Sequence, residues 1–230
     1  MTSGQSRNLV PEWLTQRARL SPARLALQAP ASDDPNNYVF LNFEQLARRV
    51  ELAARRLAAA GIKKDTRVSL LLSNSLAYVE LIHALPRLGA ILVPVSTRLS
   101  AEEAHWQIAD SDSSVLICDD STAALAAEIG RRSSRIMLLS VSSNVEPRTL
   151  GRVNDLPVTN VALAERIDLD ATHSILYTSG TTGRPKGAIL TYGNHWWSAI
   201  SSLLNLGLTS EDRWLACLPL YHIGGLAIVL

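Results

Sequence analysis

The chain has 230 residues, of which 47% are hydrophobic and 19% are charged, a composition typical of folded globular proteins rather than disordered ones. Because 22 Lys and Arg residues nearly balance 21 Asp and Glu residues, the net charge of +1 argues against a nucleic-acid or anionic-membrane partner. The two cysteines, Cys118 and Cys217, lie far apart in apolar stretches, which argues against a disulfide framework or a cysteine zinc site and favours a reducing cytoplasm.

The first long helix is expected after Asn42. No secretory signal is expected before it, because the sequence begins without a basic start followed by an apolar run. Asn42 and Gln45 form a capping pair that would begin the helix. Gly61 is expected to end the helix. Apolar residues recur at helical spacing at Phe43, Leu46, Ala47, Val50, Ala54, Leu57 and Ala58.

Strands and helices then alternate along the chain. A helix is expected over residues 75–88, with Pro86 kinking or shortening it, and a capping box of Ser100 and Glu103 predicts another to about Ala109. A small helix is expected over 123–129. Short apolar strands are expected at residues 68–72, 90–95, 115–118, 136–139 and 174–177. This alternation predicts an α/β fold with a mostly parallel sheet flanked by helices.

Three further stretches are interpreted from composition. Residues 140–166 are rich in Ser, Asn, Pro and Gly and predict a surface connection. Residues 187–210 and 214–230 carry no Asp, Glu, Lys or Arg. The first is interrupted by polar side chains and the second by Pro219 and His222, so both are expected to be buried in a folded domain rather than to span a membrane.

The most informative segment follows the last of these strands and reads Tyr177-Thr-Ser-Gly-Thr-Thr-Gly-Arg-Pro-Lys-Gly187. Glycines let successive backbone N–H groups converge on an anion, and the hydroxyls, Arg184 and Lys186 add donors and positive charge. These residue types predict a polyphosphate-binding loop. The spacing does not match a Walker loop or a dinucleotide fingerprint, and a Gly/Ser/Thr cluster after a strand is most often an ordinary loop.

Ten consecutive positions, TSGTTGRPKG, favour the functional interpretation. They resemble the phosphate-binding signature of the adenylate-forming superfamily, which includes acyl- and aryl-CoA synthetases. The segment Pro219-Leu-Tyr-His222-Ile-Gly224 resembles that superfamily's next motif, and the upstream chain from Leu41 follows its usual layout. The resemblance implies the N-terminal portion of the large domain, with a first α/β subdomain over residues 1–170 and the start of a second, carrying the loop, over 171–230.

Residues 191–199, together with the LPLYHIGGLAI segment, more narrowly resemble o-succinylbenzoate–CoA ligases of menaquinone synthesis. A structural explanation of the same residues is also available. Trp196 and Trp197 could anchor a core helix capped by Asn194, and an unexplained histidine such as His195 is more often hydrogen-bonded structure than chemistry.

The resemblance implies a two-step ligase that joins a carboxylate to AMP, using ATP, and then to coenzyme A. His222 would lie near the substrate carboxyl and the adenylate phosphate, and His195 is a second candidate for substrate binding. Mg²⁺ is expected on the nucleotide, although no protein ligand for it can be named and no His/Asp/Glu group has metal-site spacing. Lys186 would orient the loop, and the β- and γ-phosphates would be held by Thr178, Ser179, Gly180, Thr181, Thr182 and Gly183.

Family members run to roughly twice this length, so the resemblance implies that the rest of the large domain and a C-terminal lid domain are absent. The chain alone is therefore expected to be inactive and, with apolar residues 214–230 uncovered, to self-associate. The alternatives are a ligase for another fatty or aryl acid and a non-catalytic nucleotide-binding or assembly module. A nucleoside triphosphate hydrolase is disfavoured because the Walker Lys-Ser/Thr pair is missing.

Overall fold

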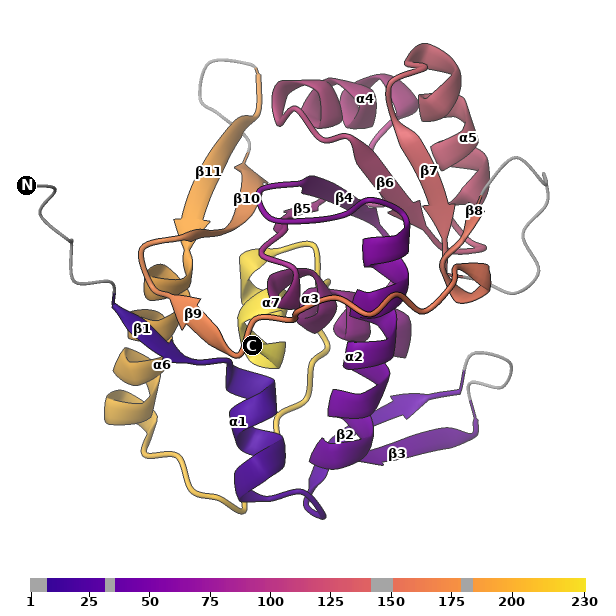
Figure 1. Cartoon of the computed structure of the whole chain (residues 1–230). Helices are drawn as coiled ribbons and strands as arrows, with labels where there is room; N and C mark the ends of the chain where they lie inside the picture. The colour runs from indigo at the N-terminus through magenta and orange to yellow at the C-terminus, as the bar shows by residue number, and fades with distance from the viewer. Residues whose placement is uncertain (1–7, 32–35, 142–150, 179–183) are drawn as a thin grey trace, which may run out of the picture.

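A seven-stranded sheet forms the centre of the protein in the computed structural model, which describes residues 8–31, 36–141, 151–178 and 184–230 (Figure 1). Its strand order is β11-β10-β5-β4-β6-β7-β8. Strands β10 through β8 pair in parallel, whereas β11 at the edge is antiparallel to β10. The expected mostly parallel α/β sheet is thus confirmed. The strands are β4 Arg67–Leu71, β5 Ile91–Pro94, β6 Val115–Cys118, β7 Met137–Ser140, β8 Gly151–Arg152, β10 Thr172–Thr178 and β11 Lys186–Thr191.

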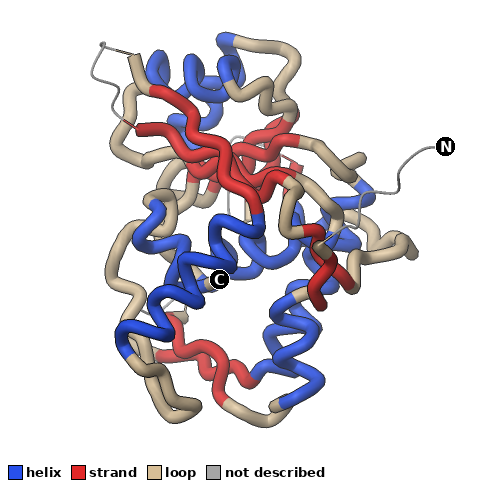
Figure 2. The backbone as a smooth tube through the Cα atoms, turned by 90° about the vertical axis from the view of Figure 1, so that its left-hand side faces the viewer, coloured by secondary structure: helices blue, strands red, loops and turns tan. Residues whose placement is uncertain are grey.

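Helices cover both faces of this sheet (Figure 2). Successive residues of a strand point to opposite faces, so Leu70 joins the core under α2 and α3 while its neighbour Leu71 joins the core under α4 and α5. Both side chains are fully buried. A parallel sheet covered on both faces needs such continuous apolar strands. The helices are α2 Phe43–Ala59, α3 Leu76–Arg87, α4 Ala101–Asp110 and α5 Ala123–Arg132.

The predicted helix signals are present as hydrogen bonds. Asn42 and Gln45 form a full capping box at the start of α2, and Ser100 and Glu103 do the same for α4. Gly61 adopts a positive φ of 85° just after α2, a conformation that costs glycine little. Pro86 lies in the last turn of α3.

Several elements do not follow from the sequence interpretation. The N-terminal part contains α1 Trp13–Leu20 and a hairpin of β2 Leu25–Pro30 with β3 Tyr38–Asn42. The expectation of a mere surface connection over residues 140–166 is wrong, because β8 extends the sheet beside β7 and Val153 of a following 3-10 turn is buried. A further strand pair consists of β1 Leu9–Pro11 and β9 Arg166–Asp168.

The C-terminal part contains α6 Tyr192–Leu206 and α7 Ile223–Val229. Helix α7 packs into the core beside α3 (Figure 1), with Leu226 fully buried. The expectation that residues 187–210 and 214–230 are buried is nevertheless wrong for part of each segment. Leu204 of α6 and Leu215 after it are each about 80% exposed, because an apolar run is buried only where another element covers it.

Strands from both sides of the expected subdomain boundary share the large sheet, since β10 lies beside β5. The division at residues 170 and 171 stays a prediction.

Candidate functional site

The β10–β11 hairpin carries the ends of the motif. β10 runs parallel to β5 and ends at Thr178, and Lys186, the first residue of β11, pairs directly opposite Thr178. Both residues are exposed. In parallel sheets, ligands bind outside the carboxyl ends of the strands, which is where this pair lies. Five predicted loop residues fall outside the described part of the chain: Ser179, Gly180, Thr181, Thr182 and Gly183.

Tyr177 anchors the loop end of this hairpin, next to Thr178. Its hydroxyl donates a hydrogen bond of 2.6 Å to Asp110 Oδ2, and its ring meets Trp106 edge-on at 6.0 Å. Burial, and then the neighbouring Asp110, raise the pKa of Tyr177, so the phenol remains a donor. Opposite Tyr177, a Cβ on Gly187 would lie 3.1 Å from the tyrosine Cζ and 3.0 Å from Ile175 Cγ2. A glycine here lets the two strands of the hairpin close.

His222 lies in the second motif, at the start of α7. Its carbonyl accepts hydrogen bonds from Gly225 N at 3.1 Å and Leu226 N at 2.9 Å, so it caps the helix. The imidazole is exposed and its ring centroid is 4.7 Å from that of Tyr221. Leu220, two residues before His222, donates its backbone N–H to the Asn74 side chain, and Asn74 follows β4.

The two motifs therefore share one edge of the sheet. Because β5 alone separates β10 from β4, the ends of these two strands lie about 10 Å apart, at twice the usual strand spacing. Thr178 and Lys186 belong to one of these strand ends, and the segment carrying His222 is bound at the other. The sequence interpretation named these residues but missed Asn74 and the Tyr177–Asp110 bond, whose partners are distant along the chain.

His195 lies in the core rather than beside this edge. Its side chain is 6% exposed, its Nε2 is 3.4 Å from Ser174 Oγ, and its ring is 4.6 Å from that of His173. Tyr192 meets His173 from another side at 4.9 Å. This placement agrees with a structural histidine, and a substrate contact by His195 stays a prediction.

The helix that carries His195 differs in detail from expectation. Thr191, not Asn194, is the N-cap residue of α6, and Asn194 completes a capping box with it. Trp196 is half-buried and stacks on Trp13 with ring centroids 6.3 Å apart. Trp197 is 63% exposed, so its expected anchoring role is wrong, because it lies on the uncovered face of α6.

The buried histidines predict a pH-dependent stability. Burial lowers the pKa of His195 from 6.5 to about 4, and burial, followed by His195 and His83, also lowers the pKa of His173. Since the folded pKa values lie below the unfolded one, the unfolded chain takes up protons first as the pH falls. Stability is therefore complete above pH 6.5 and falls toward pH 4, by about 3 kcal/mol for His195 alone. Urea unfolding between pH 7.5 and pH 4.5 measures this loss, and the His195→Gln variant should show a shallower decline.

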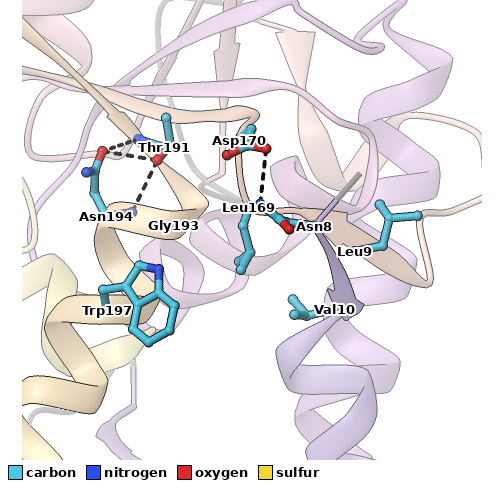
Figure 3. Close-up of a pocket in the computed structure, with 9 residues that line it drawn as sticks. All are labelled: Asn8, Leu9, Val10, Leu169, Asp170, Thr191, Gly193, Asn194 and Trp197. Atoms are coloured by element: carbon cyan, nitrogen blue, oxygen red, sulfur yellow. Dashed lines mark hydrogen bonds between the residues drawn. The ribbon is translucent and has the colours of Figure 1, made fainter. Parts of the chain in front are cut away.

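A cavity of about 570 Å³ lies at the opposite end of the hairpin (Figure 3). It adjoins Thr191, which pairs with Thr172 at the start of β10, and it contains none of the predicted site residues. Asn8 Nδ2 donates to Asp170 Oδ2 at 3.4 Å on one side of it. The lining residues are Asn8, Leu9, Val10, Leu169, Asp170, Thr191, Gly193, Asn194 and Trp197.

The described part of the chain offers neither a metal site nor a membrane-spanning helix. No group of three or more His, Cys, Asp or Glu side chains in this part of the chain is arranged to hold a metal ion. The helices found there include none with the length and hydropathy needed to cross a membrane. Cys118 and Cys217 are both free thiols, Cys118 buried and Cys217 exposed.

The chain is similar to known proteins in both sequence and fold. A 2-succinylbenzoate–CoA ligase of Geobacillus kaustophilus is 42% identical over 221 residues, covering 96% of this chain and 41% of that protein. The o-succinylbenzoate coenzyme A synthetase (MenE) of Bacillus subtilis in complex with AMP has a TM-score of 0.82 at 35% identity, covering 96% of this chain and 42% of the other. The same enzyme with ATP and magnesium ion has a TM-score of 0.79 at 34% identity, covering 96% of this chain and 54% of the other.

The family model for AMP-binding enzymes matches residues 14–230, from α1 to the last residue of the chain. The match includes the β10–β11 hairpin and the segment that carries His222. The chain spans 41% of the length of the Geobacillus relative. It belongs to the AMP-binding enzyme family.

Proposed function

We propose that this chain is the phosphate-binding part of an ATP-dependent acid–CoA ligase whose acid is o-succinylbenzoate. The observation that carries the proposal is the β10–β11 hairpin, which presents Thr178 and Lys186 opposite each other at the carboxyl edge of a parallel sheet. The acid is proposed from the relatives that are named for it and are 36–42% identical over 96% of the chain.

The chemistry that such a site must support is the approach of one anion to another. A carboxylate attacks the α-phosphorus of ATP, and pyrophosphate leaves. Coenzyme A thiolate then displaces AMP from the acyl-adenylate. The attack needs the phosphate charge to be offset and the two reactants to be held in line. Lys186 supplies positive charge and Thr178 a hydroxyl donor at the mouth of the loop, and His222 offers an exposed imidazole at the same edge.

Mg²⁺ would enter with the nucleotide. Magnesium usually keeps several water ligands and is held through substrate phosphates and one or two carboxylates, so triphosphate oxygens and water would be among its ligands here. In this proposal, the β- and γ-phosphates would be held by Thr178 together with residues 179–183.

Replacing Lys186 with alanine is expected to weaken Mg·ATP binding about tenfold, the loss of one charge-assisted hydrogen bond. Isothermal titration of the chain with Mg·ATP measures the effect. Lys186→Arg should retain much of the affinity because it keeps the charge. Lys63→Ala, an exposed lysine in the turn before β4, is the matched control and should bind as the wild type does. Equal affinities for Lys186→Ala and Lys63→Ala would refute the proposed role of Lys186.

Pyrophosphate exchange, measured beside Mg·ATP binding, separates the alternatives. The assay uses a protein that joins this chain to the family's remaining elements. If that protein binds Mg·ATP but shows no acid-dependent pyrophosphate exchange, the chain is a nucleotide-binding module. Exchange with fatty or other aryl acids, and not with o-succinylbenzoate, favours a different acyl-CoA ligase.

Self-association and a cytoplasmic location are also proposed. Apolar side chains on α6 and in the segment after it are 39–81% exposed: Trp197, Leu203, Leu204, Leu206, Leu208, Trp214, Leu215 and Leu218. Exposed apolar surface promotes association in water. Light scattering should give a mass that rises with concentration, and Leu204→Glu with Leu215→Glu should reduce it. A monodisperse monomer at all concentrations would contradict this expectation.

A further inference from the structure

Asn74 joins two segments that lie far apart along the chain. It stands three residues after the end of β4, and its side chain makes two hydrogen bonds to one backbone stretch. Nδ2 donates to the Leu218 carbonyl at 2.9 Å, and Oδ1 accepts from Leu220 N at 2.9 Å. Because the amide uses both its donor and its acceptor, it fixes the orientation of this stretch as well as its position.

The stretch held in this way leads directly to His222. Leu220 is 2% exposed and Tyr221 is 8% exposed, so the two residues before His222 are buried. His222 N donates to the Pro219 carbonyl at 3.0 Å, which closes a tight turn directly after the residues that Asn74 binds. Little freedom therefore remains between the contact with Asn74 and the backbone of His222.

Asn74, whose two hydrogen bonds clamp residues 218–220, is itself held in place at the edge of the sheet. The neighbouring residue Ser73 donates its N–H to Asp119 Oδ2 at 2.7 Å, and Ser73 Oγ lies 3.0 Å from Ser121 Oγ. Asp119 and Ser121 follow β6, which pairs with β4. The position of Asn74 is thus set by the ends of two adjacent central strands.

The far end of α7 has a separate anchor. His83, a buried residue of α3, has its Nε2 2.9 Å from the Val229 carbonyl. The helix therefore stays docked through His83 and buried Leu226 when the clamp is removed. This second anchor lets the position of His222 change without the release of α7.

We infer that Asn74 is a positioning residue, which sets the place of the His222 imidazole through the backbone of residues 218–220, at the carboxyl edge of the sheet that also carries Thr178 and Lys186. The inference rests on the proposed function, which gives His222 its role at this edge. Asn74 is exposed, and exposed side chains contribute little to global stability. Its removal is therefore expected to disturb the position of His222 while the fold persists.

The test compares Asn74→Ala and Asn74→Asp with the wild-type chain by NMR. Asn154→Ala is the matched control, because Asn154 is an exposed asparagine whose Nδ2 also donates to a backbone carbonyl, that of Val141. In Asn74→Ala, the amides of Leu220 and His222 should exchange about tenfold faster, the effect of losing two modest hydrogen bonds. Amides in β4 and α3 should be unchanged. Asn74→Asp keeps the acceptor for Leu220 N and should protect that amide partly.

The His222 ring gives the functional signal. In the wild type and in Asn154→Ala, saturating Mg·ATP should shift the His222 ring resonances, because an anion comes close to them. In Asn74→Ala, the shift should fall by half or more, and Asn74→Asp should restore part of it. Unchanged exchange and an unchanged ATP-induced shift in Asn74→Ala would overturn the inference. Failure of the wild-type chain to bind Mg·ATP would instead count against the proposed function, and the exchange rates would still decide whether Asn74 positions His222.

Discussion

Replacing Glu12 with alanine is expected to lower the free energy of unfolding by about 4 kcal/mol, because the substitution leaves Arg87 as a buried charge without its carboxylate. Glu12 is 4% exposed and Arg87 is 9% exposed, with Oε2 of Glu12 3.8 Å from Nη1 of Arg87. Thr15 connects them, since its hydroxyl donates to Glu12 and accepts from Arg87 at 2.8 Å. Glu12 also caps α1 by accepting from the backbone N–H groups of Leu14 and Thr15.

Urea unfolding at neutral pH measures this loss. Glu165→Ala is the matched control, because Glu165 pairs with Arg19 at 3.6 Å on the surface, where both side chains are at least 60% exposed. Such exposed pairs contribute at most about 1 kcal/mol. Glu12→Gln keeps an oxygen for the helix cap and isolates the loss of the charge, so its effect should lie between the two. A Glu12→Ala loss no larger than that of Glu165→Ala would refute the importance of the buried pair.

Replacing Gly225 with alanine is expected to destabilise the chain by about 3 kcal/mol, at the upper end of overpacking costs. A Cβ at this position would lie 2.2 Å from the Pro219 carbonyl oxygen and 2.8 Å from that of Leu218. These are backbone atoms of the segment that Asn74 clamps, so they cannot rotate away. Helix α7 must then move off the segment before His222.

The adjacent glycine provides the control. A Cβ on Gly224 would meet Leu218 Cδ1 at 3.0 Å, the end of a flexible and half-exposed side chain. Gly224→Ala should therefore stay within about 1 kcal/mol of the wild type, with the gain in helix propensity offsetting a small rearrangement. Thermal unfolding, together with amide exchange at Leu226, measures both variants. Similar losses for the two substitutions would show that close approach to Pro219 is not the cause.

The central architecture could be predicted because its signals are local. Buried strands such as Val115–Cys118 are continuous apolar runs, and the capping boxes at Asn42 and Ser100 are formed by residues three apart. The β2–β3 hairpin escaped prediction because it is a short, half-exposed ribbon, in which Phe40 is 58% exposed. Helix α1 escaped it because its cap is Glu12, which is not among the residue types that usually cap helices.

The candidate site was predictable to the extent that its residues lie in contiguous motifs. Thr178, Lys186 and His222 were identified from such motifs, and their shared edge follows from the strand order. The clamp by Asn74 was not predictable, because its partners lie 144 and 146 residues away. The burial of His195 depends on His173 and Ser174, which adjoin it only after β10 and α6 have packed together.

CoA-thioester formation is the most direct test that this chain is the phosphate-binding part of an acid–CoA ligase. In the assay protein, the 221 aligned residues of this chain replace their counterparts in the Geobacillus kaustophilus relative, and the unaltered relative is the positive control. With Mg·ATP and coenzyme A, mass spectrometry should detect the thioester of o-succinylbenzoate in preference to those of benzoate and a fatty acid. Lys186→Ala should slow its formation at least about tenfold. A folded assay protein that binds Mg·ATP and forms no thioester, or forms one with the other acids alone, would contradict the proposed function.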